Sequence, residues 1–183
     1  MKIELKNISI KELSKDYSDD GEGGVKGYGG KLDIRPPFQR EFVYGDKERN
    51  AVIDTVSKGF PLNVMYWAVR KNSTFEIIDG QQRTISICQF INRTFSYKKK
   101  YFQNLQEDEQ SKILNYELSV YLCTGTDTEK LEWFKTINIA GKELTDQELR
   151  NAVFHGSWVS AAKKWFSKNS CPAYQIGKDY LNG

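Results

Sequence analysis

One short segment combines residue types that could bind an anion and a metal ion. In Ile78-Asp79-Gly80-Gln81-Gln82-Arg83, a β-rich run leads into a glycine and then into a helical pattern. A glycine at such a junction lets the main chain approach a ligand closely, and the unpaired amides at a helix start attract phosphate. Arg83 would add a planar set of donors for a phosphoryl oxygen. The segment therefore predicts a phosphate-binding bend.

The polar neighbours of the glycine indicate what else this bend could bind. Asp79 could hold Mg²⁺ or orient a water or hydroxyl. Gln81 and Gln82 supply neutral donors and acceptors for a base, a sugar or a water. On spacing alone a second interpretation stays open, in which Asp79 caps the helix and Arg83 pairs with a surface carboxylate.

Another polar segment follows a stiff turn. Pro36 and Pro37 cannot donate to a strand ladder and restrict the residue before them, so Phe38-Gln39-Arg40 is expected on a rigid bend. Gln39 and Arg40 could add an amide and a guanidinium to a phosphate site. The alternative is a solvated surface arginine.

Two further patterns bear on nucleic-acid chemistry. Lys98-Lys99-Lys100, flanked by Tyr97 and Tyr101, could contact phosphates with aromatic stacking nearby, although a short lysine run is more often a solvated turn. His155 is the only histidine, which excludes two-histidine zinc sites and the usual HNH nuclease constellation. Its position near a predicted helix end is more typical of an interaction with the helix dipole.

Composition sets the broad class of the protein. The chain has 183 residues, 39% of them hydrophobic, which is enough for one domain with a substantial core. Its net charge of +3 is too small to indicate a nucleic-acid coat. Cys88, Cys123 and Cys171 are odd in number and far apart, so we expect reduced thiols in a cytoplasmic protein. No stretch has the length or apolarity of a signal peptide or membrane span, so no membrane partner is expected.

Hydrophobic spacing predicts the elements that position these residues. A short helix capped by Ser9 precedes a glycine-rich segment at about 18–30 that is expected to be a flexible loop. Strands are expected at 31–34, 64–69, 75–78 and 116–122, and the second and third are joined by a hairpin-like connection. Helices are expected at 46–58, 81–92, 107–114, 127–137, 145–154 and around 158–166. We expect a core domain over 1–125 and a helical extension over 126–183, the start of a longer helical region in a larger protein.

Four spaced segments carry a family resemblance: 34–44, 52–62, 77–84 and 134–145, the last continuing to residue 152. Their occurrence together and in this order resembles the DUF262 family, which includes GmrSD-type modification-dependent restriction enzymes. The resemblance covers about residues 30–155. One departure is tyrosine at position 44, where the family often has tryptophan, and another is that the C-terminal HNH-type nuclease of many members is absent.

The resemblance implies an α/β (α+β) fold, with a small mixed sheet of ParB/sulfiredoxin-like type, helices packed on it and a helical C-terminal part. It also implies nucleotide binding with Mg²⁺-dependent hydrolysis, and a role in defence against foreign DNA. The implied catalytic residues are Asp79, also the candidate Mg²⁺ ligand, and Arg83. The implied nucleotide-binding residues are Gln39, Arg40, Gly80, Gln81, Gln82 and Thr84, with Asn138 and Gly141 as candidates for supporting roles.

Three functions follow from these observations. The first is an NTPase with a nucleoside triphosphate and Mg²⁺ at the Gly80 bend. The second is a non-catalytic nucleotide-sensing or DNA-binding module that regulates a partner domain. The third is a metal-dependent DNA nuclease, since carboxylates and Mg²⁺ can cleave phosphodiesters without histidine. DNA, a C-terminal nuclease or helical region, and a second copy in a homodimer are the candidate macromolecular partners.

Overall fold

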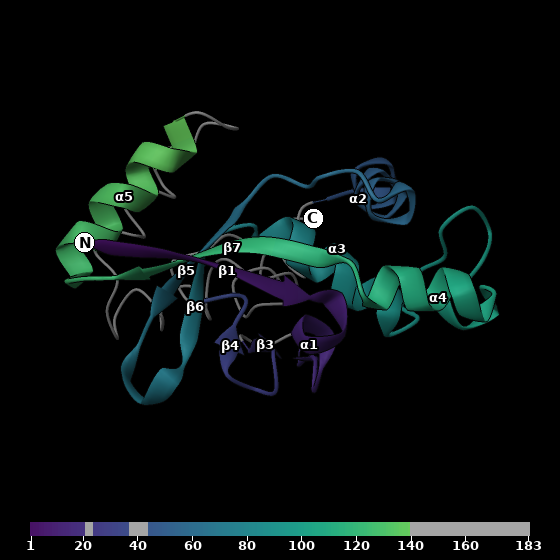
Figure 1. The fold of residues 1–183 in the computed structure, drawn as a ribbon, viewed down its shortest axis with the longest axis horizontal. Helices are drawn as coiled ribbons and strands as arrows, with labels where there is room; N and C mark the ends of the chain where they lie inside the picture. Colours follow the sequence, from purple (N-terminus) through teal and green to yellow (C-terminus); the bar gives the residue numbers. More distant parts are fainter. Residues whose placement is uncertain (21–23, 37–43, 140–183) are drawn as a thin grey trace, which may run out of the picture. The chain divides into compact units, whose positions relative to one another are not determined.

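The structure, a computed structural model, describes residues 1–20, 24–36 and 44–139. In these ranges the chain forms one mixed sheet with helices packed on it, which confirms the predicted α/β class (Figure 1). The strands are β1 (Lys2–Ser9), β2 (Ser18–Asp19), β3 (Val25–Gly27), β4 (Leu32–Asp33), β5 (Met65–Val69), β6 (Phe75–Asp79) and β7 (Glu117–Thr124). The helices are α1 (Ile10–Ser14), α2 (Asp46–Lys58), α3 (Gln81–Ile91), α4 (Glu107–Leu114) and α5 (Asp127–Ile139), with 3-10 turns at Lys71–Ser73 and Phe102–Asn104.

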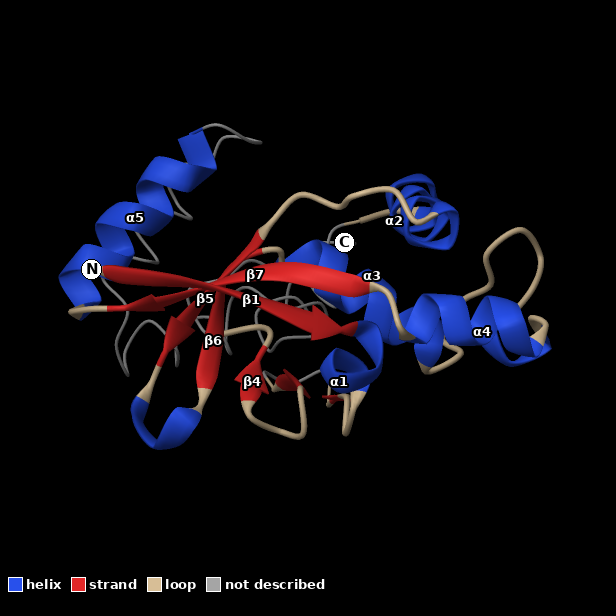
Figure 2. Ribbon diagram, in the orientation of Figure 1, coloured by secondary structure: helices blue, strands red, loops and turns tan. Residues whose placement is uncertain are grey.

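The strands follow the order β1-β7-β5-β6-β4-β3-β2 across the sheet. Figure 2 draws the strands in red and the helices beside them in blue. β7 lies between β1 and β5, antiparallel to the first and parallel to the second. β5 and β6 are antiparallel neighbours joined by the turn at Lys71–Ser73, which confirms the predicted hairpin-like connection. β6, which leads into the polar bend, also pairs with β4 in parallel. The bend therefore starts from a strand that has a partner on each side.

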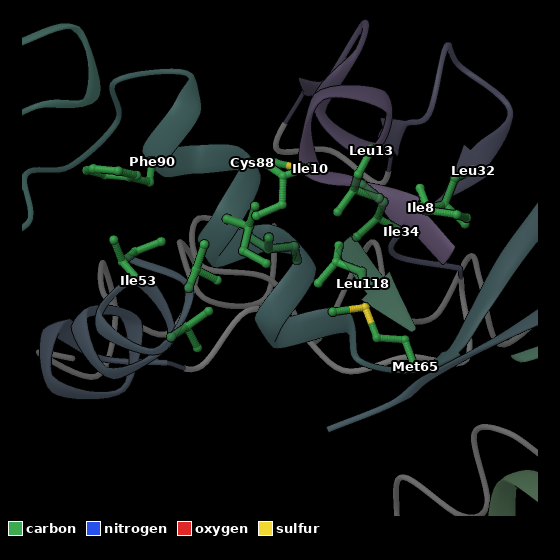
Figure 3. Close-up of a cluster of buried hydrophobic side chains, with 14 of the residues drawn as sticks. Ile8, Ile10, Leu13, Leu32, Ile34, Ile53, Met65, Cys88, Phe90 and Leu118 are labelled. Atoms are coloured by element: carbon green, nitrogen blue, oxygen red, sulfur yellow. The ribbon is translucent and has the colours of Figure 1, made fainter. Parts of the chain in front are cut away.

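The hydrophobic core surrounds α3 (Figure 3). The side chains of Ile85, Ile87 and Phe90 are at most 1% exposed. Met65 and Leu118 of the sheet belong to the same cluster, and α1 and α2 pack against α3 as well. Each fully buried large apolar side chain stabilises the fold by about 1.5–3 kcal/mol. A helix buried on several sides gives the residues at its start a fixed position.

Local sequence signals explain where the helices begin and end. Ser9 caps α1, as predicted, and forms a reciprocal capping box with Glu12; the helix is short and ends at Ser14. α2 ends at Gly59, whose φ of 71° is left-handed, as expected for a C-terminal glycine. The predicted helix boundaries of α2 and α4 agree with the structure.

Two parts of the N-terminal region differ from the predictions. β1 was not predicted, although the alternation of Ile3 and Leu5 with charged residues is typical of a strand. The segment expected as a loop contains β2 and β3, which pair with each other. Val25 is completely buried and its carbonyl accepts from the Ile34 amide at 2.7 Å. One buried side chain and a ladder contact are thus enough to form strands in a glycine-rich segment.

The described residues, including α5, belong to one compact unit. The predicted domain boundary between 125 and 126 stays a prediction, as do the helices expected at 145–154 and around 158–166, because residues 140–183 lie outside the described ranges. Among the residues that the structure describes, no helix combines the length and apolarity needed to cross a membrane.

Candidate functional site

The bend between β6 and α3 is fixed by Gly80. Its φ of 100° lies in a region that L side chains rarely adopt. A Cβ at this position would lie 2.7 Å from Cγ of Met65 on β5. Packing against Met65 and a left-handed backbone therefore both require glycine here, whereas sequence reasoning attributed the glycine to the close approach of a ligand.

Arg83 and Asp79 face each other across this bend. Nη2 of Arg83 donates to Oδ2 of Asp79 at 2.7 Å, between residues four apart in the chain. The same guanidinium donates to the main-chain carbonyls of Asn63 and Val64, which precede β5. The Arg83 side chain is 14% exposed and the Asp79 side chain 40% exposed. Arg83 thus donates to three acceptors at once and is held in place by them, while the carboxylate of Asp79 is partly exposed at the surface.

This geometry tests the interpretation in which Asp79 caps the helix and Arg83 pairs with a carboxylate, and phosphate binding at the bend stays a prediction. Asp79 does not cap the helix, because the N-cap residue of α3 is Gly80, which has no side-chain cap hydrogen bond. The capping interpretation is therefore wrong. Arg83 does pair with a carboxylate, and that carboxylate belongs to Asp79 itself. The two groups form one unit at the start of the helix, where the helix dipole favours negative charge.

The other residues of the segment lie beneath the surface. Gln81 is 4% exposed and Gln82 is 7% exposed. Nε2 of Gln82 donates to Oε1 of Gln81 at 3.3 Å, and Oε1 of Gln82 accepts from the main-chain amide of Tyr44 at 3.3 Å. Thr84 is completely buried, and its hydroxyl lies 3.5 Å from Sδ of Met65. In this conformation these side chains support the bend from below.

An aromatic group that sequence reasoning did not identify lies beside Asp79. Tyr66 of β5 is the register partner of Asp79. Its ring stacks on Tyr121 of β7 at a centroid distance of 5.4 Å and meets the edge of Trp133 of α5 at 5.8 Å. The pKa of Tyr66 is raised, mainly by burial and to a smaller extent by the electrostatic effects of Tyr121 and Asp79. The pairing of β5 with β7 brings Tyr66 and Tyr121 together, and this pairing cannot be predicted from the local sequence of either strand.

Two further arginines lie inside the described fold and were not singled out from the sequence. The Arg35 side chain is 10% exposed and lies 3.8 Å from Asp19. Arg49 donates to Gln89 of α3 at 3.0 Å, and burial lowers its pKa. Asp33 accepts from the main-chain amide of Arg35 at 3.1 Å. Burial and neighbouring charge on β6 raise the pKa of Asp33 to about 6.

Several predicted site residues cannot be placed. Gln39, Arg40 and Gly141 lie outside the described residues, and so does His155. Asn138 is part of α5, but its side chain is not described. The roles of these residues stay predictions. The chain does return to the bend just after the undescribed segment 37–43, because the amide of Tyr44 donates to Gln82.

A comparison with known families decides the identity of this fold. Residues 19–155 match the family described as GmrSD restriction endonuclease, N-terminal domain. The chain belongs to this family. The match confirms the DUF262 resemblance and makes the chain a restriction-system domain. No curated protein and no solved structure matches the chain.

The GmrSD match contains the whole of the polar bend. It includes β5, β6, α3 and β7, which supply Tyr66, Asp79, Arg83 and Tyr121, and it also includes α5. β1 and α1 lie before its first residue. The parts of the GmrSD domain that position the bend thus lie within the family region, and the edge strand β1 is outside it.

Proposed function

We propose that this domain binds a nucleoside triphosphate with Mg²⁺ at the Gly80 bend and hydrolyses it as part of a DNA-restriction system. The observation that carries the proposal is the Asp79–Arg83 pair, held at the start of α3 with the carboxylate 40% exposed. The dipole at the start of a helix favours a bound anion, and the buried side chains beneath the bend fix its position. The aromatic rings of Tyr66 and Tyr121 next to Asp79 offer an apolar surface beside the charged groups.

The donor set at the bend fits a metal that arrives with its nucleotide. Among the described residues no group of three or more His, Cys, Asp or Glu side chains could hold a metal ion. Mg²⁺ is commonly bound by one or two carboxylates together with substrate phosphates. Asp79 uses Oδ2 for Arg83, so Oδ1 is the oxygen that would contact the ion. When bound, Mg²⁺ would supply positive charge that offsets the negative charge of the phosphates.

The protein groups at the bend have separable tasks in this proposal. Arg83 has five N–H donors, and its three described hydrogen bonds leave donors for a phosphoryl oxygen. Because its guanidinium is fixed by the carbonyls of Asn63 and Val64, it would need little rearrangement to stabilise charge on the phosphate. Asp79, held by Arg83, would orient the metal-bound triphosphate.

Calorimetric titration of the common NTPs with and without Mg²⁺, combined with a phosphate-release assay, tests this proposal. We expect Mg²⁺-dependent binding and turnover in the wild type. Asp79→Asn should lose most of the Mg²⁺ dependence, and Arg83→Ala should lose most of the nucleotide affinity. Failure of the wild type to bind any NTP with Mg²⁺ would contradict the proposal.

Matched controls separate loss of the site from loss of the fold. Arg83→Lys keeps the positive charge but not the forked geometry, so it should retain part of the binding. Arg93→Ala removes an arginine just beyond the end of α3 and should leave nucleotide binding unchanged. A thermal melt of each variant shows whether the fold persists, since Arg83 also links α3 to the residues before β5.

A second candidate function is nucleotide sensing without hydrolysis. One observation favours it: Oδ2 of Asp79, the carboxylate at the bend, is already engaged by Nη2 of Arg83 at 2.7 Å. This candidate expects the same binding and the same loss in Arg83→Ala, but no phosphate release above that of a heat-inactivated sample. Turnover therefore distinguishes the enzyme from the sensor.

A further inference from the structure

A cavity apart from the Gly80 bend lies among α2, the turn at residues 97–100 and α4. Its volume is about 400 Å³, which is within the range of roughly 300–1,000 Å³ that is usual for ligand sites. α2 and α4 pack against each other beside it (Figure 1). We call it the lysine cleft, and the residues that line it include Asp54, Lys58, Tyr97, Lys98, Lys100 and Lys112.

Most of the negative charge in the lysine cleft is already engaged. Asp54 accepts from Lys58, from the hydroxyl of Tyr97 and from Lys98, the last at 3.0 Å. These hydrogen bonds lower the pKa of Asp54. Glu109 accepts from the amide of Gln106 at 3.0 Å, as part of the capping box of α4. Asp108 sits in the first turn of the same helix, where a carboxylate offsets the helix dipole.

The lysines of the cleft are not all engaged in the same way. Lys100 and Lys112 line the cavity, and neither forms an ion pair with a carboxylate among the residues that the structure describes. Lys98 and Lys99 occupy the centre of a tight turn closed by mutual main-chain hydrogen bonds of 2.9 Å between Tyr97 and Lys100. Both central residues have positive φ, at 48° and 63°, a conformation that usually selects Asn or Gly. Lys98 and Lys99 therefore occupy positions where the positive φ would favour Asn or Gly.

An exposed aromatic ring continues from the turn. Tyr101 directly follows Lys100 and is 42% exposed, while Tyr97 is 9% exposed and supports the turn. Ammonium groups that track a phosphodiester backbone, with an aromatic side chain on which a base can stack, are the combination used by proteins that bind single strands. Lysine supplies point charges for phosphate without the forked geometry of arginine, which suits contacts that ignore base identity.

We propose that the lysine cleft binds a single strand of nucleic acid, with Lys100 and Lys112 contacting phosphates and Tyr101 stacking on a base. Neither the family match nor the nucleotide site at the Gly80 bend provides this function, and it does not depend on that site. A cavity of this size can hold part of a strand, and the apolar side chains of Leu105 and Ile113 form part of its wall.

Fluorescence anisotropy with a labelled oligothymidylate, about a dozen nucleotides long, tests the proposal. We expect the wild type to bind with micromolar affinity at about 50 mM salt and to weaken steeply toward 200 mM. Lys100→Glu combined with Lys112→Glu should weaken binding about tenfold or more and reduce the salt slope by about 1.4, the amount expected for two lost phosphate contacts to a single strand. Tyr101→Ala should weaken binding about fivefold or more, and Tyr101→Phe should restore it.

The controls make each outcome decisive. Lys71→Glu reverses one charge in the exposed β5–β6 turn, half the charge change of the double variant, and should alter affinity less than about twofold. Lys100→Gln with Lys112→Gln removes charge without adding repulsion, and thermal melts should show an unchanged fold. Equal affinity of the double glutamate variant and the wild type would overturn the proposal, as would an equal loss in Lys71→Glu.

Two competitors test the chemical class of the ligand. A duplex of the same length that binds as tightly, without dependence on Tyr101, would overturn the single-strand assignment. If ATP displaced the oligonucleotide at concentrations similar to those of unlabelled oligonucleotide, and did so only when Lys100 and Lys112 were present, the cleft would be a mononucleotide site. That result would also overturn the proposal. Arg83→Ala should bind the oligonucleotide like the wild type, so failure of the nucleotide proposal and failure of this one can be told apart.

Discussion

The Gly80 bend and the lysine cleft both gather charged side chains, but they hold them differently. At the bend, Arg83 is 14% exposed and is fixed by two main-chain carbonyls and Asp79. In the cleft, the side chains of Lys58 and Lys98 are 52% and 68% exposed, and each carries its ammonium group at the end of a long flexible chain. The first arrangement is preorganised for one geometry, and the second can adapt to a variable polymer.

The difference shows how burial controls what a charge can do. A buried charge that lacks hydrogen-bond partners costs free energy, so the fold must place its partners within reach. A charge on a solvated lysine contributes little to folding, because water and salt screen it. We therefore expect changes at the bend to affect stability strongly and changes at the cleft to affect mainly binding, with small effects on stability. Four variants sharpen or break this comparison.

The largest effect is expected from Gly80→Ala. Its Cβ would lie 2.7 Å from Met65 Cγ in a left-handed backbone conformation, so we expect a loss of about 3 kcal/mol in the free energy of unfolding. Gly29→Ala is the matched control, since its φ is 68° but nothing lies within 4 Å of the added Cβ; we expect about 1 kcal/mol there. Urea unfolding measures both, and equal losses would show that Met65 does not constrain the bend.

Arg83→Ala should rank second. It leaves the carbonyls of Asn63 and Val64 and the carboxylate of Asp79 without their donor, so we expect a loss of about 2 kcal/mol. Lys112→Ala in the cleft should cost less than about 0.5 kcal/mol. Chemical denaturation of the two variants in parallel provides the measurement. A larger loss for the lysine variant would break the comparison.

A pH-dependent effect is expected at Asp33 of β4. Burial and Glu76 raise its pKa from 3.8 to about 6, so between these values the folded state keeps a proton that the unfolded state has lost. Wild-type stability therefore falls as the pH rises through this window. Asp33→Asn cannot ionise, so its stability relative to the wild type should rise by about 1 kcal/mol from pH 4 to 8, after allowance for partial solvent exposure. Tm values at both pH values test this, and a constant difference would refute it.

The smallest effect, of opposite sign, is expected at Asp54 in the cleft. Hydrogen bonds from Lys58, Tyr97 and Lys98 lower its pKa, so its contribution to stability is present at neutral pH and is lost as the pH falls through and below the usual carboxyl range. Asp54→Asn should slightly lower Tm at neutral pH, and the difference should shrink on acidification and at high salt. A difference that grew on acidification would contradict this assignment.

Sequence reasoning located the bend but not its surroundings. The β-rich run, Gly80 and the helical pattern after it are local signals, and they correctly predicted the junction of β6 and α3. The partners of Arg83 on the 63–64 segment could not be predicted, because they depend on how β5 packs against α3. Tyr66 and Tyr121 escaped detection for a related reason: they are neighbours only through the parallel pairing of β5 with β7.

The N-terminal differences have another cause. β1 carries its apolar residues on a face where Ile3 is 41% exposed and Leu5 is 54% exposed, so burial gives little indication that this segment pairs along its length with β7. β2 and β3 are too short for periodicity to detect. Local patterns thus predicted the elements whose own sequence has a clear hydrophobic face, and missed the strands that form only by pairing with segments distant in the sequence.

The position of β7 in the sheet has a consequence for synthesis of the protein. β7 separates β1 from β5, yet it is the last strand of the sheet to leave the ribosome, and Lys2 pairs with Thr124. Until then the nascent chain carries two open strand edges, and such edges attract other chains. A polypeptide that ends before residue 117 would therefore leave β1 and β5 without their shared neighbour and would be prone to aggregate, whereas a chain that includes β7 can pair with both strands.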